Sequence, residues 1–125
     1  MPFVCPECSR PKSLRIALKI ELPPDSRSDE ITLQVVECSQ CDFAGIAVYE
    51  ESRRGALGSE SSHHIGYRVS KHDLNALRKT IKACPEPTNW RCGCSAHRVL
   101  GKRDASGRWN ALDDISQEAT FALKL

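Results

Sequence analysis

Apolar and polar side chains alternate along two stretches near the start of the chain. Five apolar residues occupy every second position from Leu14 to Leu22, and three more do so from Ile31 to Val35. A period of two is typical of strands with one buried face. Together with a third apolar stretch from Phe43 to Tyr49, the pattern predicts a three-stranded antiparallel sheet.

The period changes to that of a helix in the second half of the chain. Apolar positions recur at intervals of three or four, and two prolines after Cys84 would end the helix. Ser70 and Asp73 have the spacing of a capping box at its start. The apolar stripe of this predicted helix consists of Leu74, Leu77, Ile81 and Cys84.

The remaining segments have weaker patterns. Residues 51–66 are rich in Gly and Ser and predict a flexible connection. Residues 104–107 predict a tight turn that joins residues 98–100 to residues 108–112 as a hairpin. Residues 120–125 alternate as a strand does, with a short helix as the alternative.

Composition indicates how such a chain becomes stable. Only 6% of the 125 residues are aromatic, whereas seven are cysteine. Two modules of half this length would each need a metal or another cross-link. We therefore predict a small α+β metal-stabilised protein. It consists of a zinc ribbon at 1–50, a connection at 51–66, and a helix with a Cys/His-rich basic module at 67–125.

The sequence also favours a reducing compartment. It contains no run of about eighteen apolar residues and no basic segment followed by an apolar one near Met1. We expect no membrane insertion and a cytoplasmic location. Cysteines in the cytoplasm serve as metal ligands more often than as disulfides.

Two Cys-x-x-Cys pairs predict the first metal site. Twenty-nine residues separate the pairs, which suits a long hairpin that returns the chain to the metal. Redox-active pairs are the alternative, but they would be expected beside a βαβ pattern, which is absent. Four thiolates form a closed, structural Zn²⁺ site. Its predicted ligands are Cys5, Cys8, Cys38 and Cys41.

Residues 5–49 resemble the zinc ribbons of transcription elongation (transcript-cleavage) factors. The shared features are the paired Cys-x-x-Cys motifs and the acidic pair Asp29-Glu30, which comes shortly before Cys38. In that family the acidic pair reaches into a polymerase active site and helps to bind a catalytic metal. The resemblance implies such a role for Asp29 and Glu30, although both residue types are also ordinary in turns.

The other three cysteines and a nearby histidine predict a second zinc site. Cys-x-Cys spacing with an intervening glycine forms a tight chelating turn at the end of the predicted helix. Alternatively, Cys84 only completes the apolar stripe, His97 is an exposed polar residue, or one of His63, His64 and His72 supplies a ligand. The predicted ligands are Cys84, Cys92, Cys94 and His97.

A catalytic zinc site would have three protein ligands and a water, with His97 or the pair His63-His64 as a base. The chain has no H-E-x-x-H motif, no glycine-rich phosphate loop and no zinc-deaminase pattern. We therefore expect a protein that is not an enzyme.

Positive charge is concentrated between residues 65 and 110. This stretch has ten Lys and Arg against three Asp and Glu, a net charge of +7, although the whole chain carries only +2. Such a segment can contact phosphates, with Trp90 and Trp109 stacking on bases. Alternatively, the charges form a solvated face and the tryptophans are core. The candidate phosphate contacts are Lys71, Arg78, Lys82, Arg98, Lys102, Arg103 and Arg108.

These features together favour a non-catalytic zinc protein that acts as a nucleic-acid-associated binding or assembly factor. The alternative is a protein–protein adaptor within a larger complex. A transcript-cleavage factor and a zinc hydrolase fit the residues less well.

Overall fold

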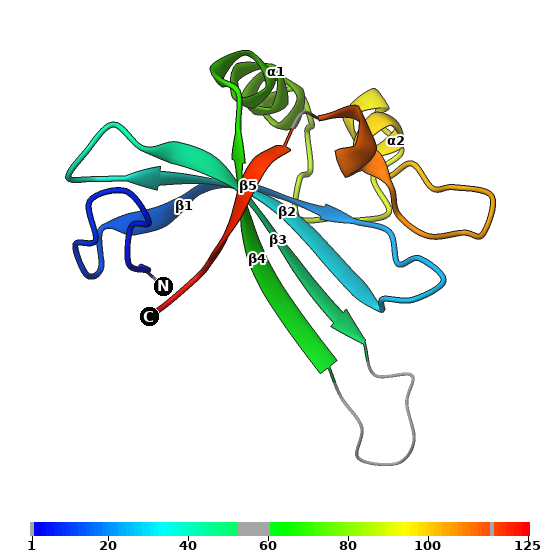
Figure 1. The fold of residues 1–125 in the computed structure, drawn as a ribbon. Helices are drawn as coiled ribbons and strands as arrows, with labels where there is room; N and C mark the ends of the chain where they lie inside the picture. Colours follow the sequence, from blue (N-terminus) through cyan, green and yellow to red (C-terminus); the bar gives the residue numbers. More distant parts are fainter. Residues whose placement is uncertain (1, 53–60, 116) are drawn as a thin grey trace.

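The computed structural model describes residues 2–52, 61–115 and 117–125, which form one antiparallel sheet with helices against it (Figure 1). The five strands pair in chain order from β1 to β5. None of the described helices is long and apolar enough to cross a bilayer. The elements are β1 (Leu14–Leu22), β2 (Glu30–Cys38), β3 (Ala44–Ser52), β4 (Ser61–Val69), α1 (Lys71–Lys82), α2 (Ser95–Leu100), the 3₁₀ helix η1 (Ala111–Asp114) and β5 (Gln117–Ala122).

Both α-helices lie on the same side of the sheet (Figure 1). The predicted stripe of α1 is buried, and it packs against apolar residues of β1, β2 and β3. Ser70 caps the helix as predicted, because its side chain accepts a hydrogen bond from the Asp73 N–H at 3.1 Å. The main core therefore combines residues from the first and the second half of the chain.

A second, smaller core lies on the opposite face. It contains Phe3 and Val36, and Phe121 packs against it. The Val4 N–H donates to the Lys124 carbonyl at 2.7 Å, and Phe3 forms a β-bridge with Leu14. The N-terminal segment thus links the two edges of the sheet, and the two termini lie side by side (Figure 1).

A β-bulge divides β1 between the two cores. Ile16 is paired with Val36, whereas Leu18 is already paired with Val35, so Ala17 is an extra residue. The apolar side chains of β1 before the bulge pack in the smaller core, whereas the apolar side chains after it pack in the main core beneath the helices. The alternation correctly predicted the strand, but not this change of face.

The sheet has five strands where the sequence predicted three. The three predicted strands are present, and β4 and β5 extend the sheet. The predicted connection over 51–66 is wrong at both ends, because residues 51–52 belong to β3 and residues 61–66 to β4. Its residues 53–60 lie outside the described part of the chain. Gly66 is tolerated in this strand because the Phe121 ring occupies the space of a Cβ atom.

The predicted hairpin after residue 98 is half right. Residues 98–100 belong to α2, because Cys94 caps that helix by accepting from the His97 N–H. The tight turn is present: the Asp104 carboxylate accepts from the Ser106 and Arg108 N–H groups, and Gly107 has a φ of +81°. Gly107 suits this left-handed conformation because it has no Cβ. An isolated bridge pairs Arg103 with Trp109 across it.

Candidate metal centres

The four cysteines of the first predicted site meet at one end of the sheet. Cys5 and Cys8 precede β1, Cys38 ends β2, and Cys41 lies just before β3. Their sulfur atoms all lie within 4.8 Å of one another. The Cys5–Cys41 and Cys8–Cys38 sulfur pairs are each 3.7 Å apart. This cluster could hold a metal ion.

Backbone N–H groups point at the sulfurs of this first cluster. The Glu7 N–H donates to Cys5 at 3.4 Å, and the Gln40 and Cys41 N–H groups donate to Cys38 at 3.3 Å. Burial alone would raise the pKa of Cys38. Hydrogen bonds from the Gln40 N–H, the Ser13 hydroxyl and the Cys41 N–H outweigh it and lower that pKa to about 6. The site thus favours a thiolate before any metal binds.

The second predicted set also converges. The ligand atoms of Cys84, Cys92, Cys94 and His97 lie within 4.8 Å of one another. The His97 Nδ1 atom is 3.2 Å from the Cys84 sulfur and 3.3 Å from the Cys94 sulfur. The Cys84 and Cys92 sulfurs are 4.0 Å apart. This cluster could hold a second metal ion.

His97 has the surroundings of a metal ligand. Its Nε2 lies 2.9 Å from the carbonyl oxygen of Glu21, and the residue is buried. A carbonyl can only accept, so Nε2 carries a proton, and Nδ1 is the ring nitrogen that is left to bind a metal. The Glu21 N–H donates in turn to the Pro87 carbonyl at 2.7 Å. The second cluster is thereby fixed to the far end of β1.

Two thiols of the second cluster have pKa values displaced in opposite directions. Hydrogen bonds from His97, through its side chain and its N–H, lower the pKa of Cys94 to about 6. Burial raises the pKa of Cys84 to about 11, and the neighbouring thiols add to this effect. A cation between the sulfurs would favour the ionised form of both.

The alternative histidines lie elsewhere. His64 is in β4, where its Nε2 is 2.7 Å from the Gln34 Oε1 atom and its ring meets Phe3 and Tyr49 edge-on. His63 neighbours it in β4, and His72 is exposed on α1. In the described part of the chain, neither metal-binding group includes any of these three.

Asp29 and Glu30 lie far from the first cluster along the strand. Glu30 begins β2, which ends at Cys38, and the Asp29 N–H donates to the Glu51 carbonyl at 2.8 Å. The acidic pair and the four cysteines are therefore at opposite ends of one strand.

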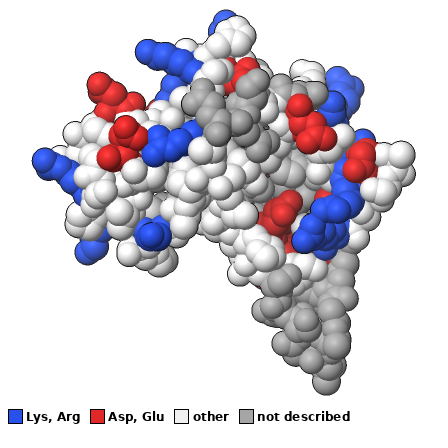
Figure 2. Space-filling model, in the orientation of Figure 1, with Lys and Arg blue, Asp and Glu red and all other residues white. Residues whose placement is uncertain are grey.

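The basic residues do not form one surface. Lys71, Lys82 and Arg98 are exposed on the two helices, while Arg78 forms an ion pair with Glu37 at 2.6 Å. Lys102, Arg103 and Arg108 flank the 104–107 turn. Of these, Arg103 is close enough to interact electrostatically with Asp25, and Arg108 with Glu50 and Asp104. Figure 2 shows positive and negative side chains interspersed over one face.

Sequence reasoning left Lys79 and His72 out of the basic set. Both are exposed on α1, on the same surface as Lys82 and Asn75. His72, Asn75, Lys79 and Lys82 follow one another at intervals of three or four residues, which places them on one face of a helix. This spacing is the signal that could have identified Lys79 and His72.

The two tryptophans occupy different environments. The Trp109 indole N–H donates to the Leu100 carbonyl at 2.6 Å, and the ring packs against the main core. Trp90 is 41% exposed, and the Arg91 guanidinium lies 4.9 Å from its ring centre. Trp109 is thus partly buried against the main core, and Trp90 is the more exposed of the two.

Comparison of the chain with protein-family models, with curated proteins and with solved structures found no match. The functional argument therefore rests on the two clusters and the surfaces around them.

Proposed function

We propose that this chain is a non-catalytic zinc protein that binds two structural Zn²⁺ ions and associates with nucleic acid. The observation that carries the proposal is the convergence of two separate tetrads, one of four cysteines and one of three cysteines and a histidine. Thiolate and imidazole donors in groups of four are the ligands that structural zinc prefers.

A non-catalytic role follows from the number of ligands. A tetrahedral Zn²⁺ with four protein ligands has no coordination position left for water or substrate. As the fourth ligand, His97 would bind the metal through Nδ1 while Nε2 donates to the Glu21 carbonyl, so neither nitrogen would be available as a base. Both points argue against the zinc-hydrolase alternative.

The exposed face of α1 supports the nucleic-acid part of the proposal. A shallow groove of about 430 Å³ runs along it, and its lining residues include no carboxylate. Arg78 is paired with Glu37, but Lys79 and Lys82 form no ion pair with the described residues, and such unpaired positive charge attracts a phosphate backbone. The groove is lined by His72, Asn75, Ala76, Arg78, Lys79 and Lys82.

Charge reversal tests the nucleic-acid contact. Lys79→Glu/Lys82→Glu should weaken binding of a labelled oligonucleotide about tenfold or more near 0.1 M salt and make the salt dependence shallower. Fluorescence anisotropy over a series of salt concentrations measures both effects. The matched control is Arg15→Glu/Lys19→Glu, which changes the charge equally at exposed positions of β1.

Two results would contradict the nucleic-acid contact. One is an equal loss of affinity in both double variants, which would indicate only a general charge effect. The other is wild-type binding that is absent, or that does not change with salt.

A further inference from the structure

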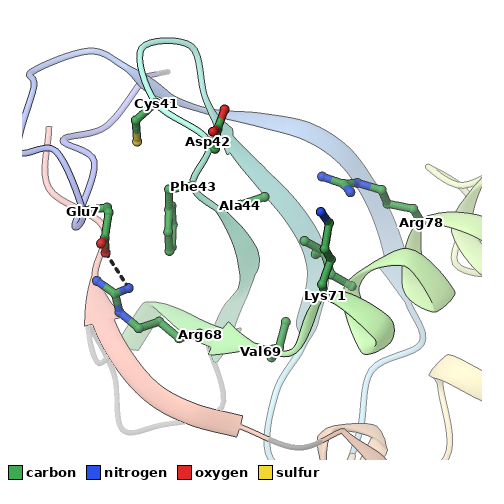
Figure 3. Close-up of a pocket in the computed structure, with 10 residues that line it drawn as sticks. Glu7, Cys41, Asp42, Phe43, Ala44, Arg68, Val69, Lys71 and Arg78 are labelled. Carbon is green, nitrogen blue, oxygen red and sulfur yellow. Dashed lines mark hydrogen bonds and ion pairs between the residues drawn. The ribbon is translucent and has the colours of Figure 1, made fainter.

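Three side chains form a hydrogen-bonded chain that runs from the sheet to the exposed face of α1. Arg78 extends from α1 towards the sheet (Figure 3), where its Nη2 atom donates to the Glu37 carboxylate of β2 at 2.6 Å. The Nη1 atom of the same guanidinium donates to the Asn75 Oδ1 atom at 3.1 Å. The Arg78 side chain is only 26% exposed, whereas Asn75 lies on the surface. The sheet therefore holds Arg78 in place, and Arg78 orients the Asn75 amide.

The direction of the Asn75 amide follows from the chemistry of its partner. A guanidinium can only donate hydrogen bonds, so it is the amide oxygen that faces Arg78. The amide nitrogen therefore lies on the other side of the group, and it forms no hydrogen bond with the described residues. Asn75 thus presents a hydrogen-bond donor to a molecule that docks on this face of α1.

The groove around Asn75 is also rich in donors. Lys79 and Lys82 carry ammonium groups, which only donate, and Arg78 keeps N–H groups beyond the two that it uses here. Apart from the engaged Asn75 oxygen, His72 is the one side chain of the groove that can also accept, and it lies about one turn before Asn75. A ligand that fits beside Asn75 and Arg78 must therefore offer acceptors.

Guanine is the base that matches such a surface. In the major groove of B-DNA, guanine presents two neighbouring acceptors, N7 and O6, whereas adenine and cytosine each present an amino donor. Thymine presents one acceptor beside a methyl group. An Asn–adenine pair needs the amide oxygen as well as the nitrogen, and here Arg78 already lies against the Asn75 oxygen. Donors on Asn75 and Arg78 can instead meet both acceptors of one guanine.

The position of these two residues on a helix favours duplex DNA. The residues of α1 that point away from the sheet are exposed, and the helix lies at the outside of the molecule (Figure 1). The major groove of B-DNA admits an α-helix, whereas side chains cannot read that of an RNA duplex. Lys79 and Lys82 follow Asn75 by one and two turns on the same face, where they can meet the phosphates that flank the base edges.

We propose that Asn75 and Arg78 recognise a guanine in the major groove of duplex DNA. The Asn75 amide nitrogen and a remaining N–H of Arg78 donate to N7 and O6, and Glu37 holds Arg78 in position for this contact. The inference rests on the nucleic-acid contact proposed above and names its substrate. The lysines of α1 provide affinity for any sequence, whereas Asn75 and Arg78 provide the preference for guanine.

Duplexes with altered bases test the recognition on the full-length, zinc-loaded chain. The fluorescein-labelled probes differ only in their central base pairs, which are guanine·C, A·T, 7-deazaguanine·C or inosine·C. Anisotropy should show the guanine duplex bound about fivefold or more tightly than the A·T and 7-deazaguanine duplexes, which lack one or both acceptors. Inosine keeps N7 and O6 and lacks only the amino group in the minor groove. The inosine duplex should therefore bind as the guanine duplex does.

Two variants assign the preference to the pair of residues. Asn75→Ala removes the donor at an exposed helix position, where Ala favours the helix, so the fold should be retained. Arg78→Lys keeps the positive charge but loses the fork that reaches both Asn75 and Glu37. Each variant should bring the affinities for the guanine and A·T duplexes close together. The control, Lys79→Glu/Lys82→Glu, should weaken binding of both duplexes and leave the ratio of their affinities unchanged.

Four results would overturn the proposal: equal binding of the guanine and A·T duplexes, equal binding of the guanine and 7-deazaguanine duplexes, weaker binding of the inosine duplex, or a preference that survives in both variants. Salt-dependent binding without a base preference, or of single strands only, would reject this inference and leave the nucleic-acid contact on α1 standing. If no oligonucleotide binds, both are rejected. The two failures are therefore distinguishable.

Discussion

His97 connects the second cluster to the fold at the scale of a single residue. Its Nδ1 faces two sulfurs and its Nε2 meets the Glu21 carbonyl, so one ring joins the second cluster to β1. Metal ligands are commonly oriented by such an outer hydrogen bond. The sequence spacing predicted the ligand, but not its partner, which is 76 positions away in the chain.

The His97→Ala variant should retain one zinc ion and lose the other. It removes a ligand and leaves the buried Glu21 carbonyl without its donor, so the melting temperature should fall as well. Metal analysis and thermal unfolding measure the two effects. His72→Ala is the control, because His72 is exposed and belongs to neither cluster. Two bound zinc ions in His97→Ala would show that His97 is not a ligand.

Asp25 is a buried carboxylate that sequence reasoning did not select. It accepts hydrogen bonds from the N–H groups of Arg27 at 2.8 Å, Ser28 at 2.6 Å and Trp109 at 2.7 Å. Burial opposes its ionisation, but these N–H groups, that of Trp109 first, outweigh it and lower the pKa of Asp25. The carboxylate thus ties the β1–β2 loop to the 104–107 turn.

Asp25→Asn should destabilise the protein by about 1–3 kcal/mol at neutral pH, because an amide has one acceptor oxygen where three N–H groups converge. A lowered folded-state pKa stabilises the fold above the ordinary value of 3.8, and this contribution is lost as the pH falls through the folded pKa. The difference from wild type in free energy of unfolding should therefore shrink below pH 3.8. Denaturant titrations at several pH values measure it, and a difference that grows on acidification would contradict the assignment.

At the scale of elements, local patterns predicted some strands and missed others. Strands β1 and β2 and the helix α1 have clear periods, and their positions were predicted within a few residues. β4 was missed because its first four residues are Ser and His, and the short alternation of Ile65, Tyr67 and Val69 that follows was not recognised as a strand. Its stability comes from pairing with β3 and β5, which a local pattern does not show.

Gly66 allows β4 to pack closely against the Phe121 ring of the neighbouring strand β5. A Cβ atom at this position would lie 2.2 Å from the Phe121 ring. Gly66→Ala should therefore push the ring out of the smaller core and cost about 1–3 kcal/mol of stability. Gly93→Ala is the control, since a Cβ there meets nothing within 4 Å. Equal melting temperatures of the two variants would argue against this close packing.

At the scale of the whole molecule, the two clusters hold opposite ends of β1. Leu14 pairs with Cys38 of the first cluster, and Glu21 is bonded to His97 of the second. At about 3.3 Å per residue, the strand separates these contacts by roughly 20–25 Å. Each metal would join chain segments that are distant in sequence, so both should stabilise the same sheet.

The eight residues of the two clusters could be predicted from the sequence because the turns that carry them are local: each Cys-x-x-Cys or Cys-x-Cys turn is visible as a spacing. The tertiary contacts around these residues could not be predicted from the sequence. The shared core between α1 and the first three strands depends on long-range contacts, as does the link between Val4 and Lys124.

The central claim is that both clusters bind zinc. Mass-spectrometric metal analysis of the purified chain, with protein concentration from amino-acid analysis, tests it most directly. The account predicts two zinc ions per chain in the wild type, and one each in Cys38→Ser and Cys92→Ser. A wild-type value of one or none, or an unchanged value in either variant, would contradict it.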